Sequence, residues 1–410
     1  MAKRILAVVE PALLRWARET AGYTIEDVAK RLKKDARVVL AWEGEGGDER
    51  PTMGQLRTLA SIYKRPLSDF YLPKPPDERP FPHDFRRAPG EVALVYSPAL
   101  RRQLRLARER RDLALSLYEE LQEPIPPIGE NIPSSADPEA VGARIRELLR
   151  VDFDQQKRWG DGRPAYNAWR RRIEAVGGLV FQFESVPPEE AWGFSIVEAI
   201  LPVIGINRRL APNGRTFTML HELTHVLLGE SATCDIDDLA PRGAREIRVE
   251  IFCNRAAAAA LMPRPGFLDH RVIREHTRGL KEWDDLEVEA IARTFGVSRE
   301  AAVRRLETFG LTSLDFYLRK RIQYKEEREQ KKRKELEAAK DRPIRRNMPQ
   351  EAISNLGRRY VSLILQNYQE DRITLLDASD YLGVRAEKVR SVEDLATDWV
   401  SDGRRDPLQY

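Results

Sequence analysis

The sequence predicts a predominantly helical α+β fold that is divided into several parts. Its first 72 residues form short amphipathic stretches, each with its own helix-start signal. Residues 179–207 instead contain three short runs rich in Val, Ile and Phe, which are typical of strands, and helical spacing returns after them. Proline-rich breaks at 73–85 and 124–133 separate the parts. The expected organisation is an N-terminal helical domain (1–75), a proline-rich linker with a long helix (76–135), a mixed domain (136–318), a basic helix or linker (319–346) and a C-terminal helical module (347–410).

Five short helices are expected in the N-terminal domain. The residues Pro11, Thr24, Asp35, Thr52 and Pro66 mark their starts, because proline suits the first helical turn and short polar side chains cap free backbone N–H groups. Two of these helices are joined by a tight turn that carries basic residues. Such a pair has the shape of a helix-turn-helix that reads DNA.

The residues of this domain resemble the Xre family of lambda-repressor-like domains over positions 11–72. The matching residues are Leu14-Arg15, Gly22-Tyr23-Thr24, Val28-Ala29, Trp42-Glu43-Gly44, Pro51-Thr52 and Gln55-Leu56. The resemblance implies that residues 35–43 form the recognition helix and that Trp42 and Glu43 are structural. It implies DNA contacts from Thr24, Lys33, Lys34, Asp35, Arg37 and Val38. The acidic loop at 45–49 departs from the family pattern. A helical bundle that dimerises or binds protein is the alternative, because the domain is only modestly basic.

A second motif, His221-Glu222-Leu223-Thr224-His225, lies in a stretch that reads as an amphipathic helix. The chain has only five histidines, and two of them stand four residues apart, on one helical face, close enough to bind a single metal ion. The glutamate is rotated from them by roughly 100° and can lean over the open side of the metal. This arrangement suits a zinc-activated water whose proton the glutamate accepts. The alternatives are two core histidines and a glutamate in a surface salt bridge.

A catalytic zinc needs a third protein ligand. The downstream candidates are Glu230, Cys234, Asp235, Asp237, Asp238, Glu246 and Glu250. Glu246 and Glu250 share a face of the next helix, which runs through the alanines at 256–260. Small alanine side chains let two helices approach closely, so a carboxylate on this helix could reach a metal on its neighbour. Spacing alone leaves the choice open.

Further residues resemble the ImmA/IrrE family of zinc peptidases. They are Thr218 to His225, Glu250 followed by Cys253-Asn254, Leu261-Met262-Pro263, the stretch 291–306 and Asp84-Phe85-Arg86. The resemblance implies a zincin-like metallopeptidase domain in which His221, His225 and Glu250 hold Zn²⁺ and Glu222 is the catalytic base. Cys253 and Ala256 stand where the family has alanine and phenylalanine. The resemblance also implies a regulatory protein as substrate, such as a repressor held on DNA.

Three strands are expected before the motif helix, at Leu179–Phe183, Gly193–Glu198 and Pro202–Asn207. The helix itself should begin at Asn213-Gly214 and end at Gly229. Metallopeptidases hold extended substrates by adding them as a strand to a free sheet edge beside this helix. We therefore expect a sheet edge immediately before it.

Charge is concentrated at residues 319–346, which hold 13 Lys and Arg against 6 Asp and Glu. A solvated helix or linker is the simpler interpretation, and a phosphate-contacting arm is the alternative. The stretches 286–306 and 357–393 both have helix-turn-helix spacing. For the first we expect a structural role, and for the second a small interaction module rather than a second DNA reader.

Cys234 and Cys253 are the chain's two cysteines, so a disulfide framework is not expected and a reducing cytoplasm is. No apolar run approaches the roughly 18 residues of a membrane span, and the apolar stretch in residues 1–10 is too short for a signal peptide. We expect a cytoplasmic DNA-binding zinc endopeptidase whose partners are operator DNA and a regulatory protein. A homodimer is one further expectation. The alternatives are a non-proteolytic regulator that uses the metal domain as a sensor, or a toxin–antitoxin or phage-defence component.

Overall fold

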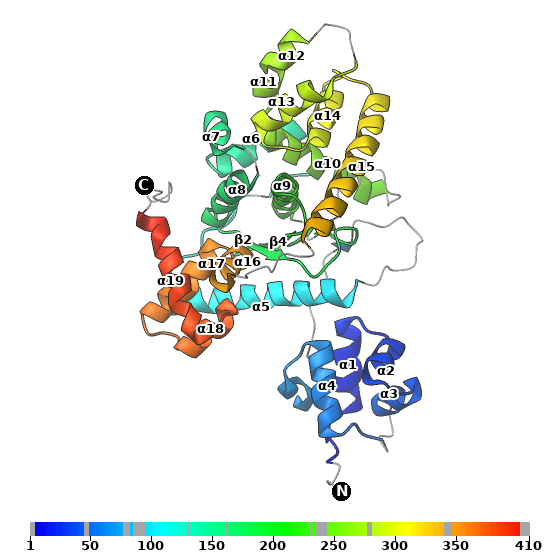
Figure 1. Ribbon diagram of the computed structural model, residues 1–410. Helices are drawn as coiled ribbons and strands as arrows, with labels where there is room; N and C mark the ends of the chain where they lie inside the picture. Colours follow the sequence, from blue (N-terminus) through cyan, green and yellow to red (C-terminus); the bar gives the residue numbers. More distant parts are fainter. Residues whose placement is uncertain are drawn as a thin grey trace. The chain divides into compact units, whose positions relative to one another are not determined.

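The computed structural model describes residues 5–44, 49–76, 83–84, 96–129, 131–160, 162–229, 232–234, 244–276, 281–339 and 347–401. The chain divides into two compact units, which are considered separately (Figure 1). The first comprises Met1–Phe81 and Gly90–Ala107, and the second comprises Pro82–Pro89 and Arg108–Tyr410. The long helix α5 (Pro98–Leu121) begins in the first unit and continues in the second. None of the described helices is long and apolar enough to cross a membrane.

The first unit is a small helical bundle. Its elements are α1 (Pro11–Ala21), α2 (Ile25–Leu32), α3 (Ala36–Glu43), α4 (Met53–Tyr63) and the 3₁₀ helix η1 (Leu67–Tyr71). Four predicted helices are therefore present, and the fifth is a 3₁₀ turn. Thr24 and Thr52 each accept the backbone N–H three residues on, while the third residue's side chain bonds back, so both form capping boxes. The buried side chains of α1 to α4 meet Phe70 in one core.

The second unit contains a five-stranded sheet in the order β1-β5-β3-β4-β2. Its strands are β1 (His83–Asp84), β2 (Leu179–Phe183), β3 (Gly193–Ile196), β4 (Val203–Asn207) and β5 (Ala232–Cys234). The three predicted strands are present, and β3 and β4 are shorter than expected. Strand β3 runs antiparallel to both of its neighbours, whereas β2 and β4 are parallel and β1 and β5 are parallel.

The sheet edge expected immediately before the motif helix is not there, because the strand next before the helix, β4, is not an edge strand of the described sheet. The two strands next before the helix, β3 and β4, are interior, because β4 lies between β3 and β2, and β3 pairs with β5 on its other side. Strand β5 follows the motif helix in the chain and returns to the sheet. Its three residues carry no strong strand pattern, so the sequence did not reveal it.

The described helices within residues 138–339 are drawn above this sheet in Figure 1. They are α6 (Pro138–Leu148), α7 (Phe153–Trp159), α8 (Arg163–Ala175), α9 (Pro212–Leu228), α10 (Ala244–Leu261), α11 (Arg264–Leu268), α12 (Arg271–Glu275), α13 (Asp285–Phe295), α14 (Arg299–Thr308) and α15 (Leu314–Ala339). The main core of the unit includes side chains of α6, α8, α9, α10, α13 and α14. Helix α10 approaches α6 closely at Gly142, where a Cβ would lie 2.5 Å from the Cβ of Ala259. The alanine run thus permits a close helix contact, here with α6.

The C-terminal helices are α16 (Met348–Leu356), α17 (Arg358–Gln369), α18 (Leu375–Leu382) and α19 (Ala386–Ser401). They are bonded to the sheet and to α8. Gln182 of β2 donates to the Ser354 carbonyl at 2.6 Å, and Arg170 of α8 donates to the same oxygen at 2.5 Å. Gly357 lies so close to Glu174 that a Cβ would be 2.3 Å from its Oε1. These contacts place α16 against strand β2.

Candidate metal centre

The motif helix α9 is buried on nearly all sides. Pro212 occupies its first turn, and Gly229 ends it with a left-handed φ of 74°, a conformation that favours glycine. Every residue from Thr218 to Leu227 is buried. A helix that is buried all round belongs to the core of its domain. The histidines and the glutamate of the motif are therefore interior groups, which excludes the surface salt bridge considered for Glu222.

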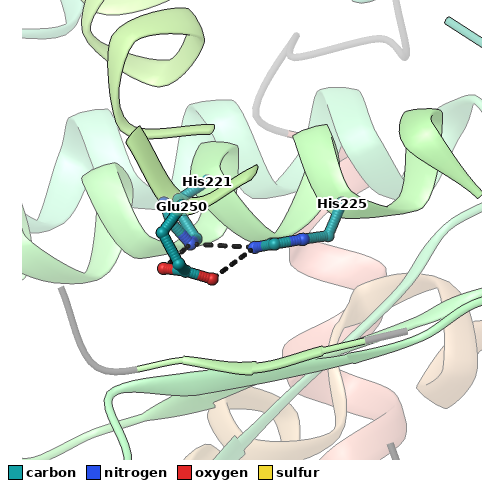
Figure 2. Close-up of side chains that lie close together, drawn as sticks. All are labelled: His221, His225 and Glu250. Atoms are coloured by element: carbon teal, nitrogen blue, oxygen red, sulfur yellow. Dashed lines mark hydrogen bonds and ion pairs between the residues drawn. The ribbon is translucent and has the colours of Figure 1, made fainter. Parts of the chain in front are cut away.

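Three side chains from two helices converge at this point (Figure 2). Nε2 of His221 lies 3.1 Å from Nε2 of His225. Glu250 on α10 places Oε2 3.4 Å from the first of these nitrogens and Oε1 3.2 Å from the second. All three side chains are fully buried. Among the described residues, these three form the group of His, Cys, Asp and Glu side chains that could hold a metal ion.

The separations of these donor atoms fit a metal site. In a tetrahedral zinc site with metal–ligand distances of roughly 2.0–2.1 Å, two ligand atoms are about 3.3 Å apart. The two nitrogens are 3.1 Å apart, and each lies 3.2–3.4 Å from one of the two Glu250 carboxylate oxygens, so all three distances are near this value. Two imidazole nitrogens and a carboxylate are also the donor set of known catalytic zinc sites. The three residues thus have both the chemistry and the spacing to hold such an ion.

Asn254 contacts the outer nitrogen of His221. Its Oδ1 lies 2.9 Å from His221 Nδ1, and it stands one helical turn after Glu250 on α10. An acceptor at this position favours the tautomer with a proton on Nδ1, which leaves the Nε2 lone pair facing the other two donors. In the sequence, Asn254 is only part of the pattern shared with the ImmA/IrrE family, and no function was predicted for it. The signal that could have found it is the four-residue spacing from Glu250.

The electrostatics favour an ionised carboxylate at the centre. Burial alone would raise the pKa of Glu250, but the two imidazoles outweigh burial and hold that pKa well below its usual range. Burial alone would lower the pKa of His221, yet the charge of Glu250 raises it, with a smaller contribution from Glu222. Glu250 is therefore present as an anion, the form that binds a cation.

Glu222 lies on another face of α9, where it meets the sheet. A Cβ built at Gly193 of β3 would be 2.8 Å from Glu222 Oε1 and 2.7 Å from Thr218 Cγ2. The glutamate is thus held between the metal-facing side of the helix and the backbone of β3. It is not one of the three converging ligands, in agreement with its expected rotation around the helix.

The other sequence candidates lie elsewhere or outside the described residues. Glu230, Asp235, Asp237 and Asp238 lie outside them, as do the side chains of Cys234 and Glu246. His270 and His276 do not join the centre. His270 lies 3.0 Å from the Thr294 hydroxyl, whereas His276 stacks on Trp283.

The predicted DNA-contacting residues lie at the two ends of α2, in the turn that follows it and at the start of α3. The side chains of Thr24, Lys33, Lys34, Asp35 and Arg37 are exposed. Val38 is half-buried and packs against the core of the first unit. Thr24 and Asp35 also act as helix caps, and Lys33 ends α2 with a φ of 53°. Part of this set therefore has a local structural role.

Trp42 and Glu43 are buried in the first unit, as their expected structural role requires. The Glu43 carboxylate accepts two hydrogen bonds from Arg18 within 2.9 Å. Part of the acidic loop after Glu43, residues 45–48, lies outside the described residues.

Comparison with known families assigns a class to the segment that contains the metal centre. Residues 176–307 match the family model of the IrrE N-terminal-like domain, a metallopeptidase family. The matched segment includes His221, Glu222, His225, Glu250 and Asn254, and it begins just before β2. No curated protein matches the chain. The match and the buried triad together support a possible metallopeptidase of the ImmA/IrrE type in this part of the molecule.

Proposed function

We propose that the protein is a zinc-dependent endopeptidase that carries a DNA-binding unit and cleaves a regulatory protein. The observation that supports this function best is the buried triad of His221, His225 and Glu250, with its donor atoms 3.1–3.4 Å apart. These three residues would hold the zinc. Bound zinc would supply Lewis-acid chemistry, polarising a peptide carbonyl and lowering the pKa of water toward roughly 7.

The other residues of the centre would move and orient protons. Glu222 would accept the proton of the attacking water and then pass it to the leaving amide nitrogen. Asn254 would keep His221 in the tautomer that faces the ligands. The complete burial of Glu222 and the triad would limit bulk water and strengthen each charge interaction.

Strand β3 is paired with β4 on one side and with β5 on the other, so neither side is open to an extended substrate. Strand β5 pairs with β3 over Gly193, Phe194 and Ser195, beside the helix that carries Glu222. A peptide that added antiparallel to β3 would have to take the position of β5. Such a peptide must itself be extended, so an unstructured segment of the target is the expected cleavage site.

The N-terminal unit would supply proximity. The exposed cations Lys33, Lys34 and Arg37 surround the α2–α3 turn, the position from which a helix-turn-helix contacts DNA. Binding near a promoter would raise the effective concentration of the peptidase around a regulator held on the same DNA. We propose that the protein acts in the cytoplasm and controls transcription by removing that regulator.

Metal analysis beside a cleavage assay tests this function. The wild-type chain should bind one zinc ion per molecule, and His221→Ala and Glu250→Ala should lose it. Glu222→Gln should retain zinc but cleave fluorescein-labelled casein, an unstructured probe, only at a small residual rate. Zinc retained in Glu250→Ala would refute the ligand assignment. Regulation that survives intact in zinc-loaded Glu222→Gln would identify a non-proteolytic regulator instead.

A further inference from the structure

Gly193 on β3 is a glycine that its backbone conformation does not require. Its φ does not lie in the left-handed region, where L side chains are rare, so an alanine could adopt the same backbone. What excludes a side chain is space. A Cβ would lie 2.7 Å from Thr218 Cγ2, 2.8 Å from Glu222 Oε1 and 3.0 Å from the Gly205 carbonyl oxygen. The glycine therefore permits a close approach between a strand and a helix.

The helix residues in this contact share one face of α9. Thr218 and Glu222 are four residues apart, which places both side chains toward β3. His221 and His225 are also four residues apart and meet Glu250 of α10 instead. Helix α9 thus presents its ligands to one neighbour and its glutamate to another. The position of the glutamate depends on how closely β3 approaches.

We propose that Gly193 is a positioning residue for Glu222, an inference that rests on the proposed function of Glu222 as the base. The bare backbone of β3 forms the wall behind the carboxylate. Any side chain at position 193 pushes that carboxylate away from its place beside the ligands, while the three ligands stay where they are. Its backbone can still pair with an added strand after substitution by alanine, so the missing side chain of Gly193 affects catalysis only through Glu222.

Gly193→Ala, Glu222→Gln and the double variant test this role, with Gly214→Ala as the matched control. Gly214 lies on the same helix α9, but a Cβ there would meet only Leu210 Cβ at 3.8 Å. Zinc content should be unchanged in all four variants. For labelled casein, Gly193→Ala should lower kcat by roughly 10- to 100-fold, as a misplacement of about 1 Å can. Its KM should change little, and Gly214→Ala should keep wild-type kcat.

The double variant separates positioning from a general structural effect. If Gly193 acts through the carboxylate, Gly193→Ala causes no further loss once Glu222 is Gln. An equal loss in both backgrounds, or wild-type kcat in Gly193→Ala, would overturn the inference while leaving the proposed function intact. If Gly193→Ala does not fold, Gly193→Ala with Thr218→Ser removes the methyl contact and keeps the carboxylate contact.

A binding measurement decides the question without turnover. Acetohydroxamate gives up its hydroxyl proton to a neighbouring carboxylate when it binds a metal centre, so its affinity reports where that carboxylate lies. Calorimetry on the zinc-loaded protein should show a similar loss, of about tenfold, in Gly193→Ala and in Glu222→Gln. Wild-type affinity in Gly193→Ala beside reduced affinity in Glu222→Gln would refute the positioning role. Wild-type affinity in both would overturn the role of Glu222 and the inference with it.

Discussion

The candidate metal centre and the surface of the N-terminal unit differ in how clearly the arrangement of their side chains indicates a ligand. At the centre, three buried side chains from α9 and α10 converge within hydrogen-bonding distances. On the N-terminal unit, all of the residues expected to contact DNA except Val38 are exposed. A metal ion is small, so the few side chains that bind it must lie close together even without it. DNA is large, so the residues that contact it can lie far apart on a surface.

The two regions also use charge differently. Glu250 stays ionised in the interior because two imidazoles face it. Glu43, also buried, stays paired because Arg18 reaches it from α1. Glu250 and the two histidines keep donor atoms that can bind a cation. The ion pair of Arg18 and Glu43 instead joins α1 to α3. Two glutamates that are similarly buried can thus have different roles, one in binding a ligand and the other in stabilising the fold. Substitutions distinguish these roles.

The largest effect is expected from loss of a ligand. His225→Ala removes one donor, and because zinc binds structural sites with roughly 10–16 kcal/mol, one ligand contributes about 3 kcal/mol. Zinc affinity, measured by competition with a chelator, should fall by a hundredfold or more. Zinc should then raise the unfolding temperature of the wild-type chain but not that of the variant.

His270→Ala is the control for this change. His270 is half-buried and bonded to Thr294, but it lies outside the triad. Zinc affinity should stay at the wild-type value in this variant. An equal loss in both variants would mean that removal of any partly buried histidine disturbs the centre, and the ligand assignment would fail.

Breaking the buried pair of the N-terminal unit should have an effect of comparable size. Arg18→Met leaves Glu43, whose side chain is 4% exposed, without its main cation. An uncompensated buried charge costs about 3–5 kcal/mol. Hydrogen exchange of residues 11–63 in the full chain should accelerate, while zinc content stays constant.

Replacing both members of the pair checks this explanation. Arg18→Met combined with Glu43→Leu removes the stranded charge and should recover most of the protection against exchange. If the double variant exchanges as fast as Arg18→Met, the lost packing of the arginine, rather than the buried charge, is responsible.

A smaller effect is expected at the metal centre from Asn254. Asn254→Ala removes the acceptor at His221 Nδ1, and loss of such an outer partner typically costs 10- to 100-fold in metal affinity. Asn254→Asp keeps an acceptor of similar size and should retain most of the affinity. Chelator competition distinguishes the two variants. Equal affinities in Asn254→Ala and wild type would show that helix packing alone orients His221.

The sequence predicted the part of the molecule that is governed by local rules. The capping residues Thr24 and Thr52, the left-handed stop at Gly229 and the strand residues of β2 to β4 were all readable from neighbouring positions. The two histidines could be paired because four residues make nearly one helical turn. Glu250 could be chosen only through the family resemblance, since Glu246 shares its helix face and other acidic or cysteine residues lie nearby in the sequence.

The features that sequence analysis missed depend on contacts between distant segments. Strand β5 pairs with β3 although α9 lies between them in the sequence. Its three residues are too few to show the alternation of apolar and polar side chains that is typical of a strand. Gly193 resembles any other strand glycine until the approach of Glu222 is known. Asn254 gains its role only when α9 and α10 lie together. Tertiary packing supplied each of these.

The smallest effect is expected on the N-terminal surface. Arg37 is exposed near the start of α3, and its neutralisation should remove about one phosphate contact. Arg37→Ala should weaken binding to a mixed-sequence 30-base-pair duplex by a few-fold and lower the slope of log affinity against log salt by about one. Arg57→Ala removes the same charge from an exposed position on α4 and should leave that slope unchanged. Fluorescence anisotropy over a range of salt concentrations measures both variants. Equal slopes in the two variants would show that net charge, rather than the α2–α3 turn, governs binding, and the helix-turn-helix assignment would then lose its support.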